Sequence, residues 1–328
     1  MEIPQTSLLK GKSFLITGGA GFIGSNIVKY LLEQGAELVR VFDNLSTGCI
    51  ENIEPFRDLP NFEFLQGDIR DLNSCIKAVE GVQYISHQAA LGSVPRSIKD
   101  PINTNAVNII GHLNMLISAK ESHSLKRMVY AASSSSFGDS TISPKVEGQE
   151  GSPLSPYAVT KKVNEMYGDV FSKVYDFNCI GLRYFNVFGP NQSAENDYAA
   201  VIPLFMKAAI SKTPPTIFGD GSQSRDFTFV ENVVQANIKA MINTENLTGH
   251  HVINIAVGEQ TSLNELWLLI QKISNTKLSP AYANRRAGDV MHSLASIANA
   301  KELINYYPEV RAEEGIKRTY DWFLAKNP

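Results

Sequence analysis

The feature that most limits the possible folds is an alternation of short apolar runs with helical patterns over the first two-thirds of the chain. Helical spacing recurs between these runs, and strand–helix–strand units of this kind form a parallel sheet with helices on both faces. Their right-handed crossovers favour a doubly wound α/β fold. The runs that predict strands are Phe14–Ile16, Leu38–Phe42, Phe62–Leu65, Val82–Ser86, Met128–Ala132 and Cys179–Tyr184. The predicted helices between them are Asn26–Gln34, Asn73–Val79, Thr104–Ser122 and Tyr157–Tyr175.

The pattern changes after about Phe185, where loops rich in glycine and proline interrupt it. The segment Phe227–Ile255 still resembles a helix–strand unit of the main sheet. We therefore predict a larger domain of residues 1–183 plus about 226–256, and a smaller α/β lobe of residues 184–225 and 257–328. The helices predicted in this part are Tyr198–Ile210, Val230–Met241, Leu263–Ile273 and Glu313–Leu324.

Composition excludes several classes of protein. The 328 residues are 43% hydrophobic and carry a formal net charge of -3, which is typical of a soluble globular chain. No excess of Lys and Arg indicates a nucleic-acid partner. No run approaches the length of a membrane span, and the N-terminus lacks a secretory pattern, so we expect a cytoplasmic protein without membrane contact. Neither the three cysteines nor the six histidines have disulfide or metal-ligand spacing, so no metal is expected.

A glycine-rich segment, Thr17–Gly24, directly follows the first predicted strand and opens the first helix. Its glycines fit G-x-G-x-x-G as Gly19, Gly21 and Gly24, and they fit G-x-x-G-x-x-G when Gly18 replaces Gly19. Glycine allows the tight turn and lets the backbone approach a pyrophosphate. The helix start at Phe22 and Ile23 would then present free N–H groups to the phosphates.

An acidic residue stands where such a site needs one. Asp43 ends the second predicted strand, 19 positions after Gly24, and a carboxylate there accepts hydrogen bonds from an adenosine ribose diol. It would repel a 2′-phosphate, and no Arg follows within Asp43–Ser46, so NAD is favoured over NADP. Asp68 and Ile69, after the third strand, are candidate adenine contacts or an ordinary surface turn.

Tyr157 and Lys161 stand four residues apart at the start of a predicted helix, which puts them on one face. A cation beside a phenol lowers its pKa from about 10. An oxidised nicotinamide would add positive charge nearby, and the tyrosine then becomes a usable general base near neutral pH. The run Ser133–Ser136 directly follows a predicted strand, and its first residue, Ser133, lies 24 residues before Tyr157. The run supplies hydroxyl groups at the edge of the sheet where ligands bind. For Ser136 a plain turn is the preferred interpretation.

Taken together these motifs resemble the extended short-chain dehydrogenases/reductases, whose fold is Rossmann-like. Within that group the chain is similar to bacterial UDP-N-acetylglucosamine 4-epimerases, over residues from about 12 to about 295. The matching segments are Thr17–Gly24, Asp43-Asn44, His87–Ser97 (H-Q-A-A-L-G-S-V-P-R-S), Ser155–Lys161 (S-P-Y-A-V-T-K), Gly181–Gly189, Ser224–Phe227 and Ala287–Ser293.

The resemblance implies a mechanism. Tyr157 would remove the proton of the sugar 4-hydroxyl with Ser133 as partner or relay, and hydride would pass from C4 to a tightly bound NAD. The 4-keto sugar would turn over and take the hydride back on its other face. Lys161 would orient the cofactor ribose, and Asn108 would brace the backbone of the site. The implied cofactor-binding residues are Gly18, Gly21, Phe22, Ile23, Gly24, Asp43, Asn44, Asp68, Ile69, Gln88, Ala89, Ala90, Asn108, Tyr157 and Lys161.

The resemblance also implies a UDP-sugar site in the smaller lobe. The diphosphate would be bound near Asn186 and two arginines, the uridine ribose by an aspartate, and the sugar by Ser93 and Arg96. A small Ser293 would leave room for a 2-acetamido group, because members restricted to the plain hexose tend to have Tyr there. The implied substrate-binding residues are Ser93, Arg96, Ser134, Ser135, Asn186, Arg225, Arg286, Asp289 and Ser293.

The resulting prediction is an epimerase of UDP-GlcNAc and UDP-GalNAc that serves surface polysaccharide precursor synthesis. A 4-epimerase of UDP-glucose/galactose stays open, as does one of a UDP-uronic acid, whose carboxylate Arg96 could pair. A dehydratase or decarboxylase is less favoured because Ser134–Ser136 contain no acid, and an NAD-sensing scaffold because Tyr157 and Lys161 are both present. The helices Thr104–Ser122 and Tyr157–Tyr175 could pair across a two-fold axis in a homodimer.

Overall fold

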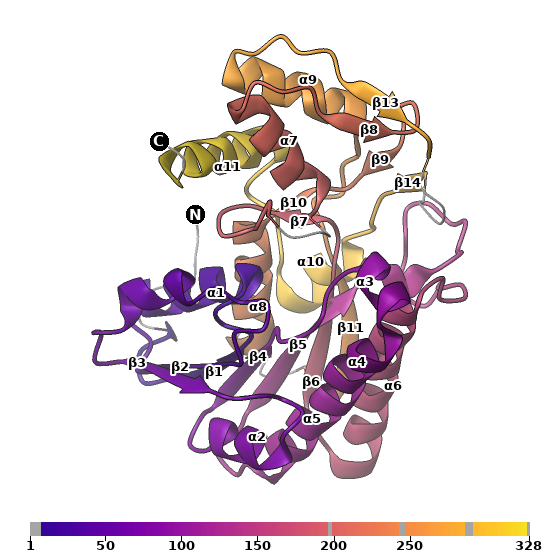
Figure 1. Cartoon of the computed structure of the whole chain (residues 1–328). Helices are drawn as coiled ribbons and strands as arrows, with labels where there is room; N and C mark the ends of the chain where they lie inside the picture. Colours follow the sequence, from indigo (N-terminus) through magenta and orange to yellow (C-terminus); the bar gives the residue numbers. More distant parts are fainter. Residues whose placement is uncertain (1–7, 196–198, 243–246, 286–290, 327–328) are drawn as a thin grey trace.

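The computed structural model describes residues 8–195, 199–242, 247–285 and 291–326 (Figure 1). Its centre is a seven-stranded sheet in the order β11-β6-β5-β4-β1-β2-β3, in which every neighbouring pair is parallel. This confirms the doubly wound α/β prediction, and the strand order reverses between β1 and β4. The strands are β1 Ser13–Thr17, β2 Leu38–Asp43, β3 Phe62–Gln66, β4 Tyr84–His87, β5 Arg127–Ser133, β6 Cys179–Tyr184 and β11 His250–Ile255.

Helices cover both faces of this sheet because each buries an apolar side against it. One face packs against α1 (Phe22–Glu33), α8 (Val230–Ile242) and α10 (Ala298–Ile304). The other packs against α2 (Leu72–Val79), α5 (His112–Glu121) and α6 (Pro156–Tyr175). None of the helices in the described part of the chain is long and apolar enough to cross a membrane.

The helix predicted over Thr104–Ser122 is longer at its start and irregular inside. It begins with α4 (Pro101–Asn105), passes through a π-helical turn (Ala106–Gly111) and continues as α5. Asp100 begins it because its carboxylate accepts the Asn103 amide at 3.1 Å and proline follows at the first helical position. A short helix that the sequence pattern did not predict, α3 (Val94–Lys99), precedes it.

The smaller lobe lies above the carboxyl ends of the main strands (Figure 1). Its core packs around Trp267 and Phe205, whose rings meet edge to face at 5.4 Å. The helices predicted in this lobe are present, but the first begins at Val201, because Ala199 and Ala200 are not helical, and Tyr198 lies outside the described residues. The helices are α7 Val201–Ile210, α9 Leu263–Ser274 and α11 Ala312–Lys326. The short strands are β7 Val187–Phe188, β8 Thr216–Phe218, β9 Ser224–Arg225, β10 Thr228–Phe229, β12 Thr261–Ser262, β13 Ala281–Ala283 and β14 His292–Ser293.

The chain crosses between the two parts more than once. After α8 it returns to the main sheet as β11, beside β6, as the sequence pattern predicts for Phe227–Ile255. The small strands pair across the crossings, β10 with β7 and β9 with both β12 and β14. The division into two domains with the stated bounds stays a prediction. Short 3-10 turns span Ile50–Asn52, Glu54–Phe56 and Ser134–Phe137.

Candidate active site

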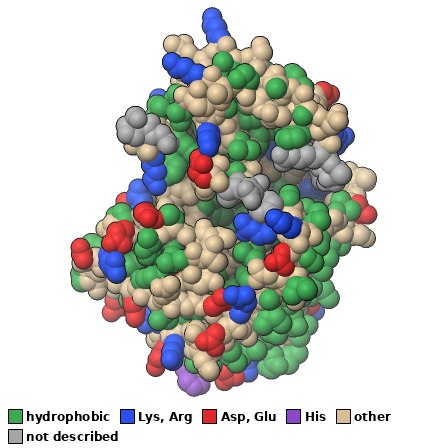
Figure 2. Space-filling view, viewed as in Figure 1, with side chains coloured by type: hydrophobic (Ala, Val, Ile, Leu, Met, Phe, Trp, Pro, Cys, Tyr) green, Lys and Arg blue, Asp and Glu red, His purple; other side chains and the backbone are tan. Residues whose placement is uncertain are grey.

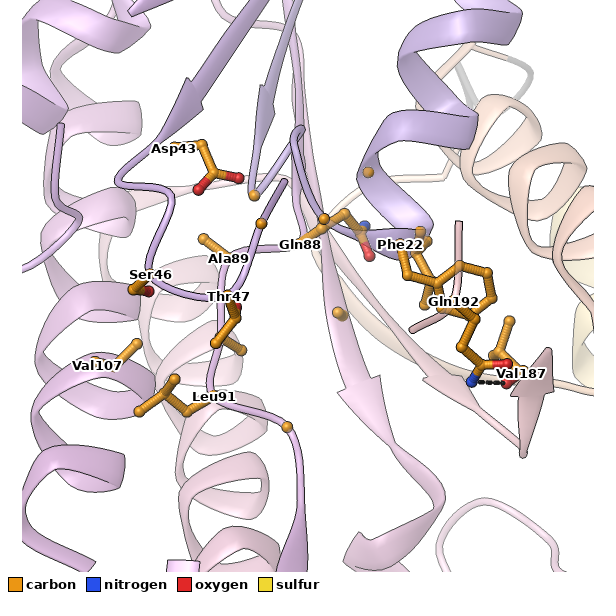
Figure 3. A pocket seen from close by; sticks show the side chains of 18 of the residues that line it. Phe22, Asp43, Ser46, Thr47, Gln88, Ala89, Leu91, Val107, Val187 and Gln192 are labelled. Atoms are coloured by element: carbon orange, nitrogen blue, oxygen red, sulfur yellow. Dashed lines mark hydrogen bonds between the residues drawn. The ribbon is translucent and has the colours of Figure 1, made fainter. Parts of the chain in front are cut away.

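A cavity of about 490 Å³ opens at the carboxyl ends of the parallel strands, where the strand order reverses. Its walls come from the segments that follow β1, β2, β4, β5 and β6. Figure 3 shows Asp43, Thr47 and Leu91 on one side of this cavity and Phe22 and Gln192 on the other. Ligands of doubly wound proteins bind at this position in the fold.

The glycine loop cannot carry side chains without moving the backbone. A Cβ on Gly24 would lie 2.1 Å from the carbonyl oxygen of Gly18, and Gly18 itself has a φ of +67°. The first turn of α1 has neither a side-chain cap nor an acidic residue. Its N–H groups, at Phe22 and Ile23, therefore remain available beside the cavity, which is the arrangement that binds a diphosphate.

Asp43 ends β2 with its carboxylate at the cavity wall. The carboxylate accepts hydrogen bonds from the Ala20 amide at 3.0 Å and the Leu45 amide at 2.8 Å, and the residue is 8% exposed. Burial raises the pKa of Asp43, and these backbone donors oppose the rise. The carboxylate is thus held in place as an acceptor for a ribose diol.

Of the predicted adenine contacts, only Ile69 lines the cavity. Asp68 binds the Arg70 guanidinium at 2.7 Å and the Asn44 amide at 2.9 Å instead. The hydrogen bond from Arg70 lowers the pKa of Asp68 to about 2. Asp68 therefore fixes Asn44, which lines the cavity, and its carboxylate is already bound to two partners.

The segment after β4 forms the floor, where Gln88, Ala89 and Ala90 line the cavity. Gln88 accepts a hydrogen bond from the Tyr184 hydroxyl at 3.1 Å and donates to the Asn237 side chain at 3.1 Å. Asn237 in turn donates to the Tyr184 hydroxyl at 2.9 Å. This closed network orients Gln88 from the core below.

The predicted catalytic pair lies at the start of α6. The helix begins there because the Ser155 hydroxyl accepts the Ala158 amide at 3.1 Å and Pro156 takes the first helical position. Tyr157 and Lys161 both line the cavity, with the Lys161 ammonium 6.0 Å from the centre of the Tyr157 ring. Lys161 is 3% exposed and donates to a carbonyl of β5 at 2.7 Å.

Ser133 ends β5 beside this pair and lines the cavity. Its hydroxyl accepts the Ser135 amide at 3.1 Å, which leaves its proton free to be donated. Ser134 and Ser135 belong to the following 3-10 turn and are not among the lining residues. The structure therefore brings one serine of the run, Ser133, to the tyrosine.

The expected lowering of the Tyr157 pKa by Lys161 is wrong for the chain alone. Burial raises the pKa of Tyr157, and only the hydrogen bond with Ser133 opposes the rise. Burial likewise lowers the pKa of Lys161 to about 8, with the charge of Glu165 opposing. Both groups have lost water, and this desolvation exceeds the attraction across the separation of the pair.

The substrate residues predicted in the smaller lobe are only partly brought together. Asn186 lines the cavity and donates to the Asp226 carbonyl at 3.1 Å. Arg225 and Ser293 are register partners in adjacent strands, β9 and β14, and lie outside the lining. Arg286 and Asp289 lie outside the described residues.

On the sugar side Arg96 lines the cavity but Ser93 does not, because Ser93 begins α3 and accepts the Arg96 amide at 3.3 Å. Asn108 also lies behind the wall. Its amide oxygen accepts the Leu91 amide at 2.8 Å, and its nitrogen donates to the Thr160 hydroxyl at 3.1 Å. Asn108 thus joins the cavity loop to α6 and does not itself line the cavity, so its role as a brace stays a prediction.

Several lining residues were not predicted from the sequence. Gln192 donates to the Val187 carbonyl at 3.1 Å, and its own carbonyl oxygen is buried without a hydrogen-bond partner in the part of the chain that the structure describes (Figure 3). Polar residues after the Gly189-Pro190 turn were the available signal. The other unpredicted lining residues include Thr47, Gly48, Cys49, Asn52, Tyr184, Asn191, Ser193, Ala199 and Ala200.

The donor set fits a dinucleotide. The glycine loop and uncapped helix start suit a diphosphate, Asp43 suits a ribose diol, and Lys161 and Tyr157 stand further along the same cavity. Among the described residues, no cluster of three or more His, Cys, Asp and Glu side chains could hold a metal ion. Fold and site together define a dinucleotide-binding α/β protein with a tyrosine–lysine pair.

Comparison with known proteins identifies the family. Residues 14–256 match the model of the NAD dependent epimerase/dehydratase family. The chain belongs to this family, and its cofactor is NAD. This confirms the resemblance and the cofactor predicted from the motifs.

Relatives align along nearly the whole chain. The UDP-glucose 4-epimerase of Mycolicibacterium smegmatis is 33% identical over 315 residues, covering 95% of this chain and 99% of that protein. The structure of UDP-N-acetylglucosamine 4-epimerase from Methanobrevibacter ruminantium, in complex with UDP-N-acetylmuramic acid, is 36% identical with a TM-score of 0.90, covering 97% and 99%. The structure of UDP-glucuronic acid 4-epimerase from Bacillus cereus, with UDP-glucuronic acid and NAD, is 29% identical with a TM-score of 0.87, covering 96% and 99%.

Proposed function

We propose that this protein is a UDP-sugar 4-epimerase that interconverts UDP-N-acetylglucosamine and UDP-N-acetylgalactosamine with tightly bound NAD. The observation that carries the proposal is that Ser133, Tyr157 and Lys161 share one cavity with the dinucleotide loop and with Asn186. Solved relatives named as 4-epimerases, bound to UDP-sugars, support the class of substrate. The cytoplasmic location and the role in surface polysaccharide precursor synthesis stay predictions from the sequence.

Each residue of the pair would have a separate task. Bound NAD would supply a hydride acceptor, and then a hydride donor, for C4 of the sugar. Tyr157 would take the proton of the 4-hydroxyl and give it back, with the Ser133 hydroxyl passing the proton or holding the sugar oxygen. Lys161 would hold the ribose of the cofactor. Asp43 and the start of α1 would hold the other end of the dinucleotide.

The choice of N-acetylated sugar rests on small side chains in the smaller lobe. Ser293 lies outside the cavity lining, and it is the family resemblance that implies room for a 2-acetamido group beside a small residue at this position. Ala200, which lines the cavity, is small as well. The relative named for UDP-N-acetylglucosamine, at 36% identity, supports this choice.

A UDP-uronic acid is the second candidate substrate. Arg96 lines the cavity, and its planar guanidinium could bind a 6-carboxylate through two parallel hydrogen bonds. The relative named as UDP-glucuronic acid 4-epimerase supports this alternative. A comparison of kcat/KM for UDP-GlcNAc and for UDP-GlcA distinguishes the two candidate substrates.

We also propose a homodimer built on α4–α5 and α6. Figure 2 shows apolar side chains gathered at the lower right, over the helices that Figure 1 labels α4, α5 and α6. The exposed apolar side chains of α6 form a stripe at helical spacing, with Met166 60%, Val170 49% and Val174 64% exposed. Ile102 of α4 is 82% exposed. A second copy of this face would cover them, and an isologous pairing of this kind is the commonest arrangement.

The test is a substrate panel of UDP-GlcNAc, UDP-glucose and UDP-GlcA, assayed with the purified protein and no added NAD. We expect UDP-GalNAc from UDP-GlcNAc at the highest kcat/KM. Tyr157→Phe should lower kcat by about 100-fold to 10,000-fold, because the general base is lost, while bound NAD is retained. Tyr307→Phe, on an exposed tyrosine remote from the cavity, is the matched control.

Other products would contradict the proposal in distinct ways. A 4-keto sugar that has lost water or carbon dioxide would indicate a dehydratase or decarboxylase. Absence of turnover with all three sugars, in a protein that still carries NAD, would indicate an NAD-sensing scaffold. Turnover that requires added NAD would contradict the tight binding of NAD but not the 4-epimerase activity.

A further inference from the structure

Asp226 is a buried carboxylate at the junction of the two parts of the chain. It stands between β9 and β10, directly after Arg225, and is 0% exposed. In the described part of the chain no Lys or Arg forms an ion pair with it. A buried charge without a cation is costly, so its partners must explain its presence.

Three backbone N–H groups supply those partners. The carboxylate accepts the Val257 amide at 3.0 Å, the Gly258 amide at 3.0 Å and the Ala295 amide at 3.3 Å. Val257 and Gly258 follow β11 of the main sheet, whereas Ala295 lies two residues after β14. One side chain therefore ties the main sheet to two segments of the smaller lobe.

The tied segments carry the substrate residues predicted from the sequence. Arg225 precedes Asp226, and Ser293, its register partner, lies two residues before Ala295. The backbone carbonyl of Asp226 accepts the Asn186 side chain at 3.1 Å, and Asn186 lines the cavity. Asp226 thus contacts, or directly adjoins, the segments that carry Arg225, Ser293 and Asn186, which we assign to the UDP-sugar.

The three contacts require both carboxylate oxygens of Asp226 to accept hydrogen bonds. Burial raises the pKa of Asp226 to about 6, and the three backbone donors oppose the rise. An amide in its place would turn an NH₂ group toward at least one N–H donor and leave that donor without an acceptor. A carboxylate is therefore the side chain that satisfies this junction.

We propose that Asp226 is a positioning residue that sets the affinity for the UDP-sugar by holding Arg225, Ser293 and Asn186 in register with the main sheet. The inference rests on the proposed function for the identity of the ligand. Asp226 itself touches neither the reacting sugar carbon nor the catalytic pair. Its loss should therefore change substrate binding and leave the chemical step largely intact.

The experiment compares Asp226→Asn with the wild-type holoenzyme. We expect KM for the UDP-sugar to rise roughly tenfold, because a buried donor loses its acceptor at the junction. The value of kcat should stay within about twofold, since interactions equal in ground and transition states change KM alone. The bound NAD content should not change. Calorimetric titration with UDP should show a matching loss of affinity without any turnover.

Asn232 provides a matched control. It is 2% exposed and makes comparable backbone contacts, accepting the Glu309 amide at 3.0 Å and the Val310 amide at 3.1 Å. These contacts lie away from the cavity. Asn232→Ala should lower the melting temperature and leave KM and UDP affinity unchanged, which separates positioning from simple stability.

An Asp226→Asn protein with unchanged KM and unchanged UDP affinity would overturn the proposal. If that variant does not fold, hydrogen exchange on the wild-type protein decides: the amides of Val257, Gly258 and Ala295 should be protected, and rapid exchange of Ala295 would refute the junction. If the wild-type protein turns over no UDP-sugar, the proposed function fails. Exchange at these three amides still tests the junction in that case.

Discussion

The phenol of Tyr157 and the ammonium of Lys161 share one face of α6, and burial disfavours the charged form of each. It raises the pKa of Tyr157 and lowers that of Lys161 to about 8. In the chain alone Tyr157 is therefore a neutral phenol at pH 7. The sequence-based expectation combined Lys161 with the positive charge of an oxidised nicotinamide, and in the chain alone the charge of Lys161 does not overcome the effect of burial.

Serine at position 293 offers the clearest single-residue test of substrate choice. Ser293→Tyr should fill the space assigned to the acetamido group and lower kcat/KM for UDP-GlcNAc by about 100-fold, while kcat/KM for UDP-glucose changes only a few-fold. Parallel assays of both sugars measure the ratio. Ser293→Ala, which stays small, should keep the wild-type preference. An equal loss on both sugars would count against a steric role.

The sequence predicts the long helices and the central strands, but it does not predict how the two-residue strands pair. The helices α6 and α9 have apolar periodicity together with a serine cap at each start, and both signals are local. The two-residue strands β9 and β14 lack any such signal, because their pairing joins segments that are far apart in the chain. The π-helical turn before α5 is equally hidden, although it places Asn108 behind the cavity wall, where Asn108 binds the Leu91 amide.

The stripe on α6 predicts the oligomeric state. Val170→Glu should give a monomer in size-exclusion chromatography with light scattering, because a carboxylate would be buried in an apolar interface. Leu268→Glu, on α9, is the matched control, since Leu268 is 63% exposed away from the stripe. A dimer that survives Val170→Glu would place the interface elsewhere.

Across the whole molecule, a row of buried aromatic and imidazole rings runs from the floor of the cofactor site through the core. The Thr17 hydroxyl and His87 Nδ1 are 2.7 Å apart, and the His87 and His112 rings are 5.3 Å apart. His112 lies 4.9 Å from the ring of Tyr130, whose hydroxyl is 2.8 Å from His250 Nε2. His112 is 1% exposed, so a positive charge on its ring would be buried.

These histidines predict that the fold is sensitive to acid. Burial lowers the pKa of His87 to about 3, that of His250 to about 4, and that of His112 well below its usual value. In the unfolded chain these histidines have pKa values near 6.5, so on acidification they bind protons there before they do so in the folded protein. Their contribution to the free energy of unfolding is therefore complete above about pH 6.5 and is lost as pH falls toward 4. Within that pH range, each histidine lowers the free energy of unfolding by about 1.4 kcal/mol for each unit that the pH falls.

Denaturant unfolding at pH 7.5, 6 and 5 measures this slope. Asp226, with its pKa raised to about 6, binds a proton earlier in the folded state and offsets part of the loss below pH 6. His112→Phe removes one titrating ring and should flatten the slope by about one histidine's share. A slope identical to that of the wild type would show that His112 does not titrate on unfolding.

The local sequence was enough for the alternating α/β architecture, the glycine loop, Asp43, and the tyrosine and lysine of α6, because each depends on neighbours within one turn or one strand. The rest of the site depends on which distant segments meet. Gln192 enters the cavity wall, Asp68 pairs with Arg70, and Asp226 joins β11 to β14 only because the chain returns to the main sheet. Burial also reversed the expected pKa shift of Tyr157, since desolvation is a property of the packed molecule and of no single segment.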